Sequence, residues 1–240
     1  MLPRPRPGRQ SFPGIVKILV RFSSGGVILP IMATSFALNE KRRAFRMLGR
    51  VLHRLTGLPL EALGKIEEVF QPVVMERGDY FQRSGDRPLH TAFVSEGLFR
   101  SFYYTDNGKE YITNFHRSGH FLGNYSAMLR GQARTRLNIA ALENSRVLLL
   151  PFDTMHSLME RDAAWERFGR RAAENLFIEK EDRERELLLL SAEERYLLFR
   201  KSPLRRMEER IPHYHIASYL GITPVGLSRI RTRLKKSGQI

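Results

Sequence analysis

The sequence predicts an α+β protein made of a small antiparallel β-roll (a jelly roll), a long helix and a C-terminal helix-turn-helix, in that order. Three observations support this fold class. Short apolar and aromatic runs separated by turn residues fill residues 70–152, a stretch without proline covers residues 162–190, and two short amphipathic segments flank a glycine near the C-terminus. A chain of 240 residues is long enough to bury a core of this size.

Residues 1–37 precede the predicted domains and differ from them in composition. Met1–Pro13 is rich in proline and arginine, and residues 1–37 hold five basic residues and no acidic ones. We expect this extension to be disordered, or to reflect an over-extended translation start with Met32 or Met47 as the true first residue. Two alternatives remain. One is a basic arm that touches DNA, and the other is a secretory signal, although its apolar core is broken and no small-residue cleavage site follows.

Residues 38–160 are predicted to contain the β-roll. Extended runs alternate there with turn signals such as Arg77-Gly78-Asp79, at a spacing of about eight to twelve residues. The clearest hairpin places Asp106-Asn107-Gly108 between Tyr103-Tyr104 and Tyr111-Ile112. Strands of this length with regular turns favour a small antiparallel roll.

Residues 161–190 are predicted to form one long helix that holds two chains together. Apolar residues recur every three or four positions and form a seam. Because a helix of this length cannot bury itself in so small a roll, pairing with its twin in a homodimer is the economical arrangement. The alternative is a single surface helix with an ordinary core stripe. The predicted dimer residues are Trp165, Phe168, Ala172 and Leu176.

Residues 191–240 are predicted to form a helix-turn-helix domain that starts at a capping box, Ser191-Ala-Glu-Glu194. Gly221 suits the end of one helix, and Thr223 and Pro224 suit the start of the next. A short helix packed across a basic helix is typical of DNA-reading proteins. The alternative is an ordinary helical hairpin with a solvated basic face. The residues expected to face inward are Ile216, Tyr219, Leu220, Leu227, Ile230 and Leu234.

The distribution of charge indicates double-stranded DNA as the partner. Residues 191–240 hold eleven Lys/Arg and four Asp/Glu, whereas residues 38–190 hold 24 and 21. A basic excess concentrated in a small terminal domain is expected of a phosphate binder.

The absence of cysteine excludes disulfides, thiolate zinc sites and cysteine-ligated iron–sulfur clusters, and it fits a cytoplasmic protein. No run approaches the roughly twenty apolar residues of a membrane span.

The order of these parts resembles the Crp/Fnr superfamily of transcription regulators, over about residues 45–236 of this chain. The resemblance implies a cyclic-nucleotide-binding-type roll, a winged-helix-like DNA-binding domain and a homodimer on a palindromic site. It also implies RNA polymerase as a further partner. Since the chain stops soon after Leu234, we expect the wing to be short or missing. The matching segments are Glu76–Phe81, Phe93–Arg100, Asp106–Glu110, Gly119–Gly123, Ala141–Ser145, Ser191–Arg195 and Ile216–Pro224.

The resemblance also implies an effector pocket in the roll, at Gly123, Asn124, Arg134 and Thr135. In members that bind cyclic nucleotides, a Gly-Glu pair holds the ribose and an Arg-Ser/Thr pair holds the phosphate. Asn124 replaces that glutamate here, and residues 162–190 contain no Ser or Thr to read the base. We therefore expect no cofactor and no cyclic nucleotide, and the effector, if there is one, is an unknown small molecule. A cyclic-nucleotide-responsive regulator remains the alternative.

DNA contacts are likewise implied by the position of each residue relative to the family's recognition helix. Pro224, Val225 and Arg229 are expected to reach base edges, with Arg229 suited to bidentate guanine readout. Val225 stands where relatives often carry a glutamate, so it can offer only an apolar contact. The expected phosphate contacts are Thr223, Ser228, Arg231 and His213.

Two other classes of function stay open. The first is a cupin-like metal enzyme, for which His116 and His120 would be ligands, but these two histidines flank Gly119 and are not expected to share a face. The second is a roll that regulates a partner protein after losing DNA binding. Against it, Arg229, Arg231 and Arg233 are all present. We therefore expect neither an enzyme nor a metal site.

Overall fold

The computed structural model describes residues 36–240 except residue 65. The expectations for residues 1–35, including a start at Met32, lie outside the described residues. Three helical elements precede the first strand, and none of them was predicted from the sequence. They are α1 (Leu38–Thr56), the 3-10 helix η1 (Leu60–Leu63) and α2 (Ile66–Val69).

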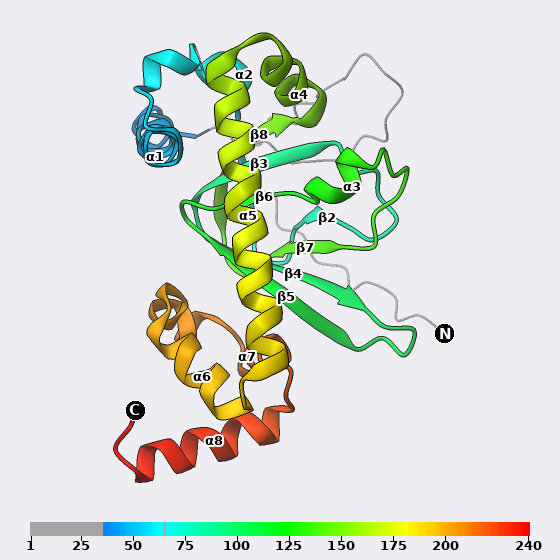
Figure 1. The fold of residues 1–240 in the computed structure, drawn as a ribbon, viewed down its shortest axis with the longest axis vertical. Coiled ribbons are helices and arrows are strands. Elements are labelled where there is room, and N and C mark those ends of the chain that lie inside the picture. Colours follow the sequence, from blue (N-terminus) through cyan, green and yellow to red (C-terminus); the bar gives the residue numbers. More distant parts are fainter. Residues whose placement is uncertain (1–35, 65) are drawn as a thin grey trace, which may run out of the picture.

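Two four-stranded antiparallel sheets form the roll, which confirms the predicted β-roll (Figure 1). Apolar side chains from both sheets meet between them, among them Val94, Phe99 and Val147. The first sheet has the order β1 (Gln71–Met75), β8 (Ser145–Pro151), β3 (His90–Glu96) and β6 (Phe121–Leu122). The second has the order β2 (Tyr80–Gln82), β7 (Asn138–Ala141), β4 (Leu98–Tyr104) and β5 (Glu110–Arg117). A short helix, α3 (Tyr125–Leu129), follows β6.

Strands β4 and β5 form the predicted hairpin around Asp106-Asn107-Gly108. Tyr103 lies opposite Tyr111, and Phe102 lies opposite Ile112. The two tyrosines are exposed, whereas Phe102 and Ile112 are buried. Since β5 is at the edge of its sheet, its outer backbone groups need partners from elsewhere in the chain.

The long helix α5 (Ala163–Leu189) follows α4 (Phe152–Arg161) and runs past the roll to the C-terminal module (Figure 1). Asp162 caps it, because its side chain accepts hydrogen bonds from the backbone of Ala164 and Trp165. The N-terminal half of α5 packs against α1 and the roll, in a core that includes Phe45, Phe93 and Trp165. None of the helices in the described part of the chain has the length and apolar character that a membrane crossing needs.

The predicted dimer seam of α5 is wrong for its first two residues. Trp165 and Phe168 are only 2% and 3% exposed within a single chain. The indole nitrogen of Trp165 also donates a hydrogen bond to the carbonyl of Leu63. The seam expected to face a second chain therefore faces α1 instead, a helix whose apolar side was not recognised in the sequence. Ala172 is partly buried against the same core, and Leu176 is exposed.

The C-terminal module, residues 191–240, consists of α6 (Ala192–Lys201), the 3-10 helix η2 (Pro203–Arg210), α7 (His213–Tyr219) and α8 (Pro224–Lys236). The expected capping box starts it: Ser191 and Glu194 each accept a hydrogen bond from the other's backbone. Every residue of this module is described, and none of them is in a strand. The module therefore contains no β-hairpin wing.

The module is docked on the outer face of the β4–β5 sheet. Leu98, Phe102 and Phe115 of the roll share one apolar core with Ile216 and Leu220 of the module. In addition, the hydroxyl of Ser218 donates to the carbonyl of Glu110 at 2.9 Å and accepts from the backbone nitrogen of Ile112 at 3.0 Å. Ser218 thus satisfies backbone groups at the free edge of β5 and fixes α7 against it.

Candidate nucleic-acid interface

The turn between α7 and α8 has the geometry that the sequence predicts. Gly221 has a φ of 70°, which a residue with a side chain rarely adopts, and the backbone nitrogen of Ile222 bonds back to the carbonyl of Ala217. Thr223 caps α8, since its hydroxyl accepts a hydrogen bond from the backbone of Gly226 at 3.1 Å. The cap and Pro224 start α8 at a defined angle to α7.

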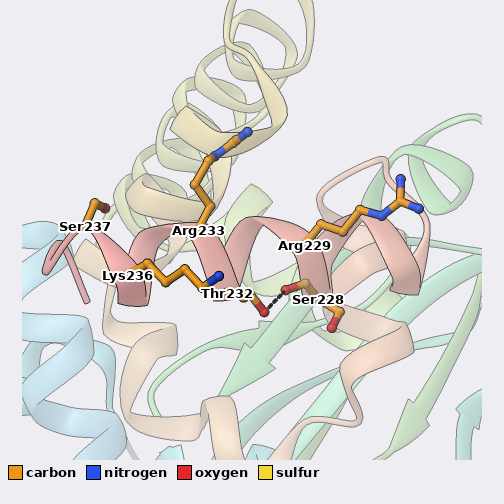
Figure 2. Close-up of a pocket in the computed structure, with 6 residues that line it drawn as sticks. All are labelled: Ser228, Arg229, Thr232, Arg233, Lys236 and Ser237. Atoms are coloured by element: carbon orange, nitrogen blue, oxygen red, sulfur yellow. Dashed lines mark hydrogen bonds between the residues drawn. The ribbon is translucent and has the colours of Figure 1, made fainter.

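One side of α8 is buried and the other is open to solvent. The inner side contributes Leu227, Ile230 and Leu234 to the core shared with α6 and α7, as expected. The outer side forms an open, shallow depression, along which Figure 2 shows six side chains. They are Ser228, Arg229, Thr232, Arg233, Lys236 and Ser237. All six are polar or basic, and such a surface can contact phosphates and base edges.

Arg229 and Arg233 differ in what they are free to bind. Arg233 turns back from α8 and pairs with Glu193 of α6. Arg229 has no ion pair or hydrogen bond to any described side chain, and it is exposed. Arg229 is thus an unengaged guanidinium on the outer side of α8. Val225, one turn earlier, is 60% exposed and can offer only its methyl groups.

Arg231 is not on this outer side, so its assignment as a phosphate contact is wrong. Its guanidinium turns inward, where it pairs with the carboxylate of Glu208 and donates to the hydroxyl of Tyr196 at 3.0 Å. It also lies 2.7 Å from Nε2 of His213. Because a guanidinium can only donate, His213 must accept that bond. His213, another of the four expected phosphate contacts, is therefore already engaged by Arg231.

Glu208 is the centre of this polar cluster. Its side chain is 7% exposed and accepts hydrogen bonds from Tyr196, Arg200 and Arg231. Burial favours the neutral acid, but the hydrogen bonds from Arg231 and Tyr196 outweigh it and lower the pKa of Glu208. The cluster joins α6, η2 and α8 through one buried carboxylate, which fixes the rotation of α8 about its own axis. Sequence patterns did not reveal it, because its members are scattered from Tyr196 to Arg231.

The residues expected to form an effector pocket lie close together, and their polar side chains are hydrogen-bonded within the protein. The Asn124 amide donates to the hydroxyl of Thr135 at 2.9 Å, and its carbonyl oxygen caps α3. Thr135 is buried, whereas Arg134 is exposed and donates to the backbone carbonyl of Gly85. At Gly123 a side chain would lie 3.2 Å from the methyl group of Thr91, so the backbone there is closely covered.

The two histidines considered for a metal site are engaged within the protein. Nε2 of His116 lies 2.7 Å from the hydroxyl of Ser101. Burial, and then the neighbouring His120, lower the pKa of His116 to about 3. Burial and the charge of Arg117 lower the pKa of His120 to about 4. Across residues 36–240, residue 65 aside, no three His, Cys, Asp or Glu side chains are grouped so that they could hold a metal ion.

Comparison with known proteins is consistent with this architecture. Residues 72–162 match the model of the cyclic nucleotide-binding domain family. The chain is 30% identical over 196 residues to electron transport regulator A of Shewanella oneidensis, covering 75% of this chain and 74% of that protein. It is 28% identical over 194 residues to the fumarate and nitrate reduction regulatory protein of Escherichia coli K12, with the same coverage. Both relatives are regulatory proteins.

A solved structure shows the same fold. FixK2 from Bradyrhizobium japonicum superimposes with a TM-score of 0.62 at 22% sequence identity, covering 71% of this chain and 86% of that one. The described roll, long helix and C-terminal helical module therefore occur together in a known protein.

Replacement of Glu208 by glutamine tests the buried cluster. Arg200 and Arg231 would then lie in a buried site without a counter-charge, so we expect the free energy of unfolding at neutral pH to fall by about 3 kcal/mol. Because the pKa of Glu208 is lowered, its contribution is complete above the ordinary value of 4.5 and is lost as the pH falls below it. The difference between the two proteins should therefore shrink in acid. Urea unfolding of E208Q and of the neighbouring surface variant E209Q measures this, and equal stability of the two variants at neutral pH would contradict it.

Proposed function

The chain belongs to the Crp/Fnr family of transcription regulators and is a DNA-binding regulator, and we propose that it reads a palindromic duplex site as a homodimer, without a cyclic nucleotide. In this proposal α8 enters the major groove, and the protein acts in the cytoplasm. The single observation that carries the proposal is the contrast between the two sides of α8. Its inner side is buried in the module, and its outer side carries the unengaged Arg229 among polar and basic neighbours.

Specific base reading by Arg229 is proposed from its exposed position just over one turn after α8 starts at Pro224. A free guanidinium on an exposed helix can donate two parallel hydrogen bonds to the edge of a guanine. Thr223 and Ser228 flank it and are proposed to contact phosphates, whereas Arg233 is held back by Glu193. Pro224 and Val225 remain proposed neighbours of the bases, and Val225 would contact a thymine methyl group.

Arg229→Ala is expected to relax discrimination at one guanine position. Binding sites are first selected from random duplexes with the wild-type protein, and affinities are then compared on the selected site and on single-base variants. We expect R229A to lose about 1–3 kcal/mol of binding free energy on the selected site. On the variant site in which that guanine is replaced, R229A and the wild-type protein should bind equally well. An R130A variant, changed on the remote roll, is the control. An equal loss on every sequence would make Arg229 a phosphate contact instead.

A second chain is proposed to pack against the exposed apolar residues of α5. Two triplets are exposed there, Leu176-Phe177-Ile178 and Leu187-Leu188-Leu189. They are eleven residues apart, which is close to three helical turns, so they lie on the same side of α5. Exposed apolar groups in two consecutive patches on one helix are unusual for a chain that stays alone in water. Of the seam expected from the sequence, Leu176 and the partly buried Ala172 remain available for this contact.

Phe177→Glu combined with Leu188→Glu is expected to yield monomers. Two charges placed in the proposed apolar contact would have to be buried without partners, which opposes association. Sedimentation at micromolar concentration should show a dimer for wild type and a monomer for the double variant, with operator affinity strongly weakened. Glu181→Gln, on the same helix, should stay dimeric. A wild-type chain that sediments as a monomer would contradict the proposal.

Function without a cyclic nucleotide is supported by the bonding of Asn124 and Thr135. Their polar groups satisfy each other and the start of α3, so a nucleotide would have to displace these bonds before making its own. Asn124 also lacks the negative charge that could accept from both ribose hydroxyls. No Ser or Thr occurs in α5 to reach a base.

Titration calorimetry with cyclic AMP and with cyclic GMP is expected to detect no binding at micromolar concentration. Each unmade hydrogen bond forfeits roughly 1–3 kcal/mol, and two such losses lower the affinity by several decades. Arg134→Ala should then behave as wild type does. Micromolar binding that disappears in R134A would contradict this part of the proposal and favour a nucleotide-responsive regulator.

A further inference from the structure

The outer face of α1 carries an uninterrupted set of basic side chains. Between Glu40 and Thr56, every exposed residue of this helix is an arginine or a histidine. Four of the arginines recur at intervals of four residues and so form one line about 18 Å long. The set consists of Arg42, Arg43, Arg46, Arg50, His53 and Arg54.

Among the described residues, none of these five arginines has a carboxylate partner. Within the described residues, the ion pairs on α1 engage only Lys41, with Glu67, and Glu40, with Arg146. Residues 1–35 contain no Asp or Glu, so that segment cannot supply a partner either. The arginines of α5 differ, because several of them pair with glutamates one turn away, as Arg170 does with Glu174. An ordinary solvated helix surface mixes both signs of charge in this way, and the outer face of α1 does not.

The helix that displays these arginines is rigidly held. Its inner face buries Phe45, Leu48 and Leu52 against α5 and β3, and Gly57 ends it in a left-handed conformation. The positive charges are therefore fixed on the body of the protein and do not depend on a flexible tail. Because the apolar face of α1 is already buried, this helix cannot insert that face into a membrane.

The chemistry of the face fits a phosphate backbone. It has no exposed apolar or aromatic side chain between Asn39 and Gly57, and such side chains form the centre of most protein–protein contacts. Arginine is suited to phosphate, since its planar guanidinium donates paired hydrogen bonds. The regulator already has a polyphosphate partner, the DNA bound at α8.

The position of α1 in the fold indicates which part of the DNA could supply these phosphates. Helix α1 packs with its inner face against the N-terminal half of α5, and α8 lies beyond the other end of α5 (Figure 1). A helix of 27 residues is about 40 Å long, which corresponds to roughly a dozen base pairs. We propose that the arginine face of α1 binds the phosphate backbone of the DNA that flanks the operator, when this DNA bends from α8 toward the roll. The inference rests on the proposed DNA binding by α8.

The test compares one selected operator on two duplexes, one with a few flanking base pairs and one with about twenty-five on each side. Wild type should bind the long duplex more tightly and bend it, as measured by energy transfer between dyes at its ends. Arg46→Gln with Arg50→Gln should leave binding to the short duplex unchanged. On the long duplex it should reduce both the bend and the salt dependence, lowering the slope of log K against log salt by about two per protomer. Arg130→Gln with Arg136→Gln removes the same charge from a loop of the roll and should match wild type on both duplexes.

Three results would overturn the inference. They are equal wild-type affinity for the two duplexes, an equal loss by R46Q/R50Q on both, and an equal loss by the control variant. In all three, the wild-type protein still binds the short operator specifically. Failure of the wild type to bind the short operator would instead overturn the proposed DNA binding itself, so the two failures are distinguishable.

Discussion

The orientation of α8 relative to the roll depends on the apolar contact between the C-terminal module and the outer face of the β4–β5 sheet. Phe102 and Phe115 of the roll lie in the same core as Ile216 and Leu220 of the module. The contact is made specific by Ser218, which bonds to two backbone groups at the edge of β5. A shift of the module would expose both the apolar core and these backbone groups to water. The roll and the module that carries α8 are therefore joined by one apolar core and by two hydrogen bonds at the edge of β5.

Within the module, the buried carboxylate of Glu208 fixes the orientation of α8. It holds Arg231 on the inner side of α8, which leaves the outer side to Arg229. Two arginines two residues apart on a helix point in different directions, and here one serves the fold and the other is available to DNA. Removing a charge from such a pair is costly because the remaining partner stays buried. This constraint keeps the outer face of α8 aimed in one direction.

In the roll, the polar groups of the residues proposed for an effector site are satisfied within the protein. The Asn124 amide donates a hydrogen bond to the hydroxyl of Thr135. Buried polar groups seek hydrogen bonds whether or not a ligand is present, and an amide beside a hydroxyl provides one. Arg134 remains at the surface, bonded only to the backbone of Gly85.

The sequence by itself determined the order of the parts and their local geometry. Turn residues and hairpin spacing predict the roll, and the Gly221-Ile-Thr-Pro224 signature predicts the turn before α8, because these features depend on neighbours in the chain. Tertiary structure decided which faces are buried. The seam of Trp165 and Phe168 would be apolar whether it faced a second chain or the same chain. Only the packing of α1 shows that it is covered within one chain. Likewise, an arginine's sequence position does not say whether it meets a buried carboxylate 23 residues away, as Arg231 does, or solvent, as Arg229 does.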